Sequence, residues 1–167
     1  MAPDGPGGRE DFSRRFRDAW GRFATGVVVI TTVEPDGSVH GMTANGVASV
    51  SLEPPLALAC VGRVRNTHRL IRSTGRFGLS VLAHSQRSIA EYYVRPAAAR
   101  TGDVPVTFER LPGDWPVVAG AVAQMGCRLV SEHEGGDHTI FVAHVEAVSI
   151  GHERPLVYYR GSYSPLT

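Results

Sequence analysis

Residues 26–61 read GVVVITTVEPDGSVHGMTANGVASVSLEPPLALACV, and this stretch decides the fold. It holds a β-branched run at 27–33, a Pro-Asp-Gly turn at 35–37, a return segment of small and apolar residues at 39–52, and a second apolar run at 56–61. β-branched runs that end at turn residues are typical of strands joined as a hairpin. The continuous apolar run indicates a strand that is buried on both faces.

The residues before this stretch follow a different pattern. Apolar side chains recur at helical spacing from Phe12 to Phe23, with arginines on the other face, which predicts an amphipathic helix. Residues 1–10 hold acids, glycines and prolines but no apolar core, so we expect a disordered tail there and not a signal peptide. Residues 11–167 are then expected to form one domain.

The residues after the stretch add two short helices and four strands. The first helix starts at Asn66, a residue type that caps helices, and ends at Gly75. The second helix is expected at 86–93, the strands at 77–81, 122–132, 138–150 and 156–160, and a long irregular excursion at 94–120. Strands outnumber helices, so the sequence predicts a mainly β fold, an antiparallel barrel that is closed or nearly closed, with flanking helices.

Composition narrows the function. The net charge of +1 argues against a nucleic-acid partner, and no apolar run is long enough to predict a membrane span. All 17 cationic side chains are arginine, which excludes chemistry that needs a lysine amine. Cys60 and Cys127 lie in apolar segments and are expected to be buried thiols, which fits a reducing cytoplasm.

Common cofactor and metal motifs are missing from the sequence. It contains no G-x-G-x-x-G, H-E-x-x-H, C-x-x-C or G-x-S-x-G pattern. The seven histidines are scattered, and none of their spacings matches the short-range ligand pairs of metal sites. We therefore expect no metal, with three histidines from distant strands as the alternative.

Six motifs occur in order along the chain. They are GVVVITT (26–32), GMTANGVASVSLEPPLALACV (41–61), RNTHRL (65–70), STGRFGLSVL (73–82), GDHTIFVAHV (136–145) and PLVYYRGSY (155–163). Together they resemble the flavin reductase-like family with the FMN-binding split-barrel fold, which contains the reductase components of two-component flavin-dependent monooxygenases. The resemblance covers about residues 12–163. It implies a six-stranded antiparallel Greek-key barrel and a homodimer whose flavin sites lie near the subunit interface.

The resemblance also implies which residues contact the flavin. The family's contacts to the flavin ring and ribityl chain fall on Thr43, Ala44, Asn45, Ser49, Val50, Ser51 and Leu52. Small residues suit this role because a flat ring with amide-like edges needs close approach and short polar partners. A strand of small residues at a tight barrel corner is the alternative explanation. Gly46 stands where the family often has serine, which leaves the preference between FMN and FAD open.

The turn at Arg63, Arg65, Asn66 and Thr67 matches the family's phosphate-binding turn. Two arginines just before a helix start combine positive charge with free backbone N–H groups, and no acidic residue is nearby in the sequence. The alternative is a solvated basic turn in which Asn66 acts only as a cap.

His138 is the candidate catalytic residue. It corresponds to the histidine of the family's Gly-Asp-His motif, which sits beside the flavin where nicotinamide docks. Tyr159 and Arg160 match a C-terminal segment that helps to hold the nicotinamide cofactor. For a lone histidine, a structural role is the alternative.

These observations lead to one functional hypothesis with two alternatives. The chain is expected to transfer a hydride from NADH or NADPH to FMN or FAD and to supply the reduced flavin to a partner monooxygenase, with the cofactors providing the reactive groups. The first alternative is a flavoprotein of the same fold that retains its ligand and acts directly on a metabolite. The second is a non-catalytic flavin-binding module.

Overall fold

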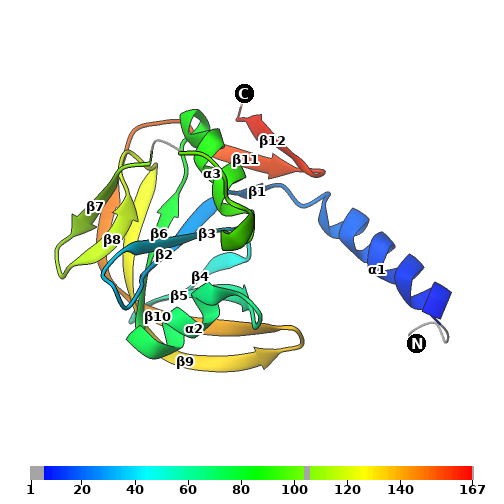
Figure 1. Cartoon of the computed structure of the whole chain (residues 1–167), viewed down its shortest axis with the longest axis horizontal. Coiled ribbons are helices and arrows are strands. Elements are labelled where there is room, and N and C mark those ends of the chain that lie inside the picture. Colours follow the sequence, from blue (N-terminus) through cyan, green and yellow to red (C-terminus); the bar gives the residue numbers. More distant parts are fainter. Residues whose placement is uncertain (1–5, 104–105, 167) are drawn as a thin grey trace.

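The computed structural model describes residues 6–103 and 106–166 (Figure 1). Within them the main sheet has seven strands in the order β3-β2-β6-β9-β10-β5-β4, all antiparallel to their neighbours. The strands are β2 (Val28–Val33), β3 (Val39–Ala44), β4 (Val47–Leu52), β5 (Pro55–Gly62), β6 (Arg76–Val81), β9 (Ala123–Gly135) and β10 (His138–Ile150). The helices are α1 (Pro6–Trp20), α2 (Asn66–Thr74) and α3 (Arg87–Tyr93). The predicted mainly β fold is confirmed.

The connection between β3 and β4 curls this sheet into a barrel. These two strands are the opposite edges of the sheet, yet only Asn45 and Gly46 separate them in the chain. The sheet must therefore bend until its two edges meet at this corner. The amide of Cys60 on β5 donates a hydrogen bond of 2.8 Å to the carbonyl of Gly46, which ties the corner to the sheet. β3 and β4 do not pair with each other, so the barrel is split along this line.

The corner also explains a difference from the expected strand number. The resemblance implied six strands, whereas the main sheet has seven in the part of the chain described. We expected residues 39–52 to form one return segment, but the chain turns at Asn45 and Gly46 and divides it between the two edges of the sheet.

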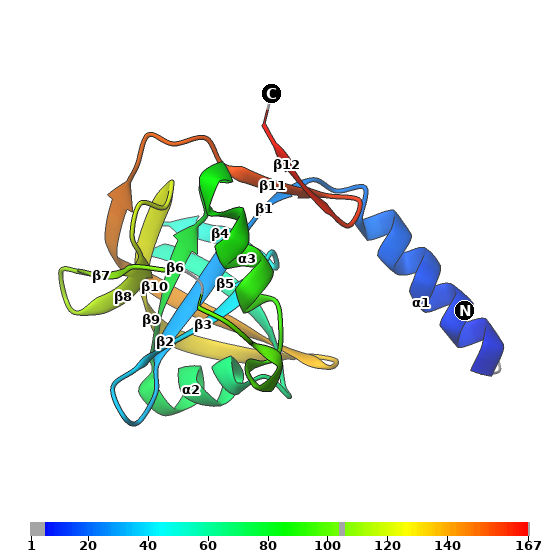
Figure 2. The same ribbon diagram turned by 45° about the horizontal axis from the view of Figure 1, so that its top comes forward.

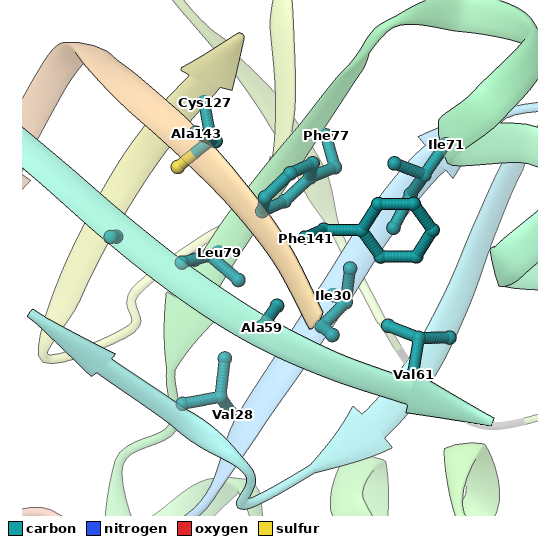
Figure 3. Close-up of a cluster of buried hydrophobic side chains, with 11 residues drawn as sticks. Val28, Ile30, Ala59, Val61, Ile71, Phe77, Leu79, Cys127, Phe141 and Ala143 are labelled. Atoms are coloured by element: carbon teal, nitrogen blue, oxygen red, sulfur yellow. The ribbon is translucent and has the colours of Figure 1, made fainter. Parts of the chain in front are cut away.

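The core fills the inside of the barrel. Alternate residues of β5, including Ala59 and Val61, are buried there. Figure 3 shows the side chains of this cluster converging between the strands, with the rings of Phe77 and Phe141 near its centre. Ile71 from α2 packs against the same cluster. Burial of large apolar side chains is the main stabilising contribution to a domain of this kind, and here it also fixes α2 against the barrel.

The excursion at 94–120 contains a hairpin that pattern analysis missed. β7 (Phe108–Leu111) pairs with β8 (Trp115–Val118). A proline inside β8 and a Pro-Gly turn before it hide the strand pattern. β8 packs over the main sheet where Gly78 of β6 and Gly126 of β9 stand directly opposite each other. A Cβ on either glycine would overlap atoms of Trp115 or Pro116, so the two glycines make room for the hairpin.

The segment that follows α1 pairs with the C-terminal strands beside the barrel. α1 projects away from the body in both views (Figure 1, Figure 2). Because α1 begins at Pro6, residues 6–10 are helical and not part of a disordered tail as we expected; residues 1–5 lie outside the described residues. β1 (Thr25–Gly26), β11 (Leu156–Tyr159) and β12 (Ser162–Pro165) form a small separate sheet. No helix in the described ranges is long and apolar enough to cross a membrane.

The close approach of β8 to the sheet predicts the effect of a small substitution. Gly126→Ala should lower the free energy of unfolding by about 1 to 3 kcal/mol, because the added methyl group overpacks against the buried Trp115 ring. Gly26→Ala is the matched control, since a Cβ there meets no atom within 4 Å. Chemical unfolding of both variants measures the difference. If Gly126→Ala and Gly26→Ala had equal free energies of unfolding, the packing of β8 would not require a glycine at position 126.

Candidate functional site

The ends of β5 and β10 bring two predicted sites together. His138 stands opposite Gly62 in the register of these strands, and the amide of Arg63 donates a 3.0 Å hydrogen bond to the carbonyl of Asp137. A Cβ placed on Gly62 would lie 3.5 Å from Cγ of Arg65 and 3.7 Å from Nε2 of His138. The proposed nicotinamide histidine and the proposed phosphate turn therefore flank the same glycine at one end of the barrel.

His138 is accessible and oriented by its neighbour. Its side chain is 48% exposed, and Nδ1 lies 2.8 Å from Oδ1 of Asp137. This hydrogen bond holds the pKa of Asp137 below its ordinary value, so the carboxylate is an acceptor. In the neutral ring Nδ1 then carries the proton, which leaves Nε2 as an acceptor on the side of Gly62.

The start of α2 is an uncapped helix N-terminus. Arg65 occupies the N-cap position with an extended backbone and makes no side-chain capping bond, and the first turn contains no acidic residue. The first backbone N–H groups of a helix lack partners within the helix and carry partial positive charge. Arg63 and Arg65 are exposed beside them, although Arg63 also lies 3.3 Å from Glu134. These donors suit a phosphate group.

The side chains of Asn66 and Thr67 have other partners. Asn66 is the first residue of α2 and not its cap, and its Nδ2 donates a 2.6 Å hydrogen bond to Glu34, at the end of β2. Thr67 is 1% exposed, and its hydroxyl lies 3.0 Å from Nε2 of His40 on β3. The expectation that Asn66 caps the helix was wrong, because its side-chain amide donates a hydrogen bond to Glu34 and Arg65 occupies the N-cap position. Asn66 and Thr67 can still offer backbone N–H groups to a ligand.

The seven predicted flavin contacts do not converge within one chain. Thr43, Ala44 and Asn45 lie at the barrel corner; the Thr43 hydroxyl donates a 2.9 Å hydrogen bond to the Ala90 carbonyl of α3. Ser49, Val50, Ser51 and Leu52 continue along β4, away from this corner, and Leu52 pairs with Pro55 at the far end of β5. Gly62 is seven positions after Pro55, a span of about 23 Å along a strand. Ser51 and Leu52 are therefore remote from His138 of the same chain.

The C-terminal candidates lie at the turn between β11 and β12, near Asn45 of the corner. Arg160 has a left-handed backbone (φ 50°) in the turn between β11 and β12, and its amide donates a 2.9 Å hydrogen bond to the Gly21 carbonyl just after α1. Its guanidinium lies 5.7 Å from the centre of the exposed Tyr159 ring. Arg160 and Asn45 line one cavity of about 570 Å³ together with the end of α1.

The two cysteines are free thiols. Cys60 and Cys127 are both free, as predicted, but only Cys127 is buried; Cys60 is partly exposed, because alternate residues of β5 face away from the core. Burial raises the pKa of Cys127 to about 12, which makes that thiol unreactive at neutral pH. Among the residues that the structure describes, no three His, Cys, Asp or Glu side chains are grouped closely enough to hold a metal ion.

Two arginines near the site escaped the sequence reasoning. Arg95 and Arg100, from the excursion after α3, line a cavity that also contains Arg65, Asn66 and Thr67. The only signal in the sequence was the unusual length of that excursion.

Comparison with known proteins identifies the family. The family model of the flavin reductase like domain matches residues 20–167. The chain is 40% identical over 152 residues to an NADH-dependent flavin reductase of Rhodococcus sp, which covers 90% of this chain and 84% of that protein. It is 38% identical over 148 residues to the reductase component of 4-nitrophenol 4-monooxygenase/4-nitrocatechol 2-monooxygenase of Rhodococcus opacus, covering 89% of this chain and 78% of that protein.

Solved structures agree with this assignment. The flavin reductase PheA2 in its native state superposes with a TM-score of 0.85 at 40% identity, covering 92% of this chain and 97% of that one. A Streptomyces globisporus NADH:FAD oxidoreductase in complex with NAD and FAD fragments gives a TM-score of 0.85 at 31% identity, covering 94% of both chains. The predicted family, fold class and cofactors are confirmed. The chain belongs to the flavin reductase like domain family and is a nicotinamide-dependent flavin reductase.

Proposed function

We propose that hydride transfer takes place where β5 ends and β10 begins, and that the reduced flavin then passes to a partner monooxygenase. The observation that carries this proposal is the placement of His138 and Arg65 on either side of Gly62. A bound flavin supplies a ring that accepts a hydride, so the protein has to bind, orient and exclude water. The relative from Rhodococcus opacus, named as a reductase component, supports the monooxygenase as recipient.

The residues at this end of the barrel fit the parts of a flavin. The uncapped start of α2, with Arg63 and Arg65, would hold the phosphate through backbone N–H groups and guanidinium charge. Thr43, Ala44 and Asn45 would lie against the ring at the corner, where Gly46 and Cys60 leave little room for larger side chains. Either FMN or FAD carries the phosphate and ring that this arrangement needs.

His138 would orient the nicotinamide of NADH or NADPH. Asp137 fixes the ring so that Nε2 is the acceptor, and a carboxamide N–H is a suitable donor to it. Tyr159 and Arg160 would hold the rest of that cofactor from the other side of the corner. In this role His138 moves no proton. It selects the orientation in which the nicotinamide meets the flavin.

We also propose that the protein is a homodimer. Phe12, Phe16, Trp20 and Phe23 lie along α1 or just after it and are 54–65% exposed, and Leu52 on β4 is 92% exposed. Large apolar side chains that are exposed on a helix projecting from the body (Figure 2) mark an interaction surface. A second copy would cover them, and it would explain why Ser49, Val50, Ser51 and Leu52 are remote from His138 of their own chain, since they would serve a site near the interface. The two free thiols favour the cytoplasm as its compartment.

The role of His138 can be tested by substitution. His138→Ala should lower kcat/KM for NADH about three- to tenfold, the loss of one hydrogen bond, while flavin affinity and thermal stability stay nearly unchanged. The side chain is half exposed and its one hydrogen bond among the described residues goes to the exposed Asp137, so folding depends little on it. Single-turnover kinetics with preloaded flavin, together with a melting curve, give both readouts.

His152→Ala, at an exposed histidine in the loop before β11, is the control and should keep wild-type kinetics. If well-folded His138→Ala protein kept the wild-type hydride-transfer rate and NADH dependence, His138 would have no part in nicotinamide binding.

The homodimer has its own test. Light scattering at micromolar concentration should give a mass of two 18.0 kDa chains. Replacing both Phe16 and Trp20 with serine should shift the protein toward the monomer, whereas Val130→Ser, at an exposed apolar residue of β9, should not. A single-chain mass for the unmodified protein would refute the dimer.

A further inference from the structure

A cavity of about 210 Å³ lies beside the phosphate turn, between the start of α2, β3 and the segment after α3. We call it the arginine cavity, because Arg65, Arg95 and Arg100 line it. The other residues that line it are His40, Met42, Val64, Asn66, Thr67, Tyr93, Pro96 and Ala97, so no carboxylate of the described residues takes part.

The charges around this cavity are not compensated within the protein. In residues 6–103 and 106–166, none of the three arginines makes a salt bridge, whereas Glu34, in the turn between β2 and β3, is already engaged by His40, Asn66 and Arg69. Burial lowers the pKa of Arg100, and the nearby charge of Arg65 acts in the same direction. Burial and Arg100 also lower the pKa of His40. Like charges gathered in one hollow favour an anionic ligand.

Arg100 is held in place before any ligand arrives. Its NH2 group donates a 2.9 Å hydrogen bond to the carbonyl of Gly41 on β3, and its Nε donates a 3.1 Å hydrogen bond to the carbonyl of Arg95. The guanidinium lies 4.9 Å from the centre of the Tyr93 ring. Neutral carbonyls and a ring fix its direction without cancelling its charge, an arrangement that reduces the entropy lost when an anion binds.

We propose that Arg100 and Arg95 are further ligands of the flavin phosphate and determine the preference for phosphorylated flavins over riboflavin. The proposal rests on the function proposed above, since Arg65 belongs both to the phosphate turn and to this cavity. Met42 lines the cavity, and Asn45 marks the corner about 10 Å further along the chain. The ribityl chain of a flavin bridges a gap of that order, with its ring at the corner and its phosphate among the arginines.

The test compares flavins that differ in the phosphate. Flavin fluorescence titration measures the Kd of FMN, FAD and riboflavin for the wild type, Arg95→Ala, Arg100→Ala and Arg100→Lys, and a parallel titration measures the Kd of NADPH for the same proteins. Arg95→Ala and Arg100→Ala should each raise the Kd of FMN and FAD about tenfold and leave that of riboflavin unchanged, since each removes a charge-assisted hydrogen bond. Arg100→Lys should lose less FMN and FAD affinity than Arg100→Ala, because lysine keeps the positive charge but lacks the paired N–H donors of the guanidinium. Arg154→Ala, at an exposed arginine far along the chain, is the control.

Three outcomes would overturn the proposal. One is an equal loss of affinity for riboflavin and FMN, which would mean that Arg100 only stabilises the fold through its hydrogen bond to β3. Another is unchanged Kd values in both Arg95→Ala and Arg100→Lys, variants that remain informative if Arg100→Ala does not fold. The last is weaker binding of NADPH alone, which would assign the cavity to the phosphate of the nicotinamide cofactor. Reduction of flavin by the wild type is measured separately, so a failure of the proposed function is distinguishable from all three.

Discussion

The rest of the structure depends on the requirement that the two edges of one sheet meet at Asn45 and Gly46. Because β3 and β4 are consecutive in the chain but lie at opposite ends of the strand order, the sheet can only exist as a curled, split barrel. This curvature encloses the apolar cluster shown in Figure 3. It also brings the end of β5 to the corner, where Gly62 is followed at once by the turn into α2. The site is a consequence of that closure.

Electrostatics then give this end of the barrel its specificity. The start of α2 has no cap, and among the described residues Arg65, Arg95 and Arg100 beside it make no salt bridge, so their positive charge lacks a local acidic partner. Glu34 could have neutralised it, but its carboxylate is taken by Asn66, His40 and Arg69. The same contacts tie the first turn of α2 to β2 and β3. Glu34 therefore holds the phosphate turn in place without neutralising the positive charge that a ligand would meet there.

The sequence was most informative where structure is local. The β-branched run at 27–33 and the apolar run at 56–61 predicted β2 and β5 closely, because burial and strand preference act on the same residues. Contacts between residues far apart in the sequence could not be predicted. Asn66 looked like a cap, but Glu34, on another element, takes its side chain. The β7–β8 hairpin was missed because Pro116 interrupts its pattern, while the opposed glycines that receive it lie on two other strands.

The most direct test of the central claim is rapid mixing of NADH with the wild-type protein preloaded with FMN or with riboflavin, following the loss of flavin absorbance. If the phosphate is held at the start of α2 and the ring reacts beside His138, the maximal rate of bleaching should be similar for both flavins, because the ring is the same. Half-saturation should require far more riboflavin than FMN. Equal half-saturation for the two flavins, or no bleaching with either, would contradict this account of the site.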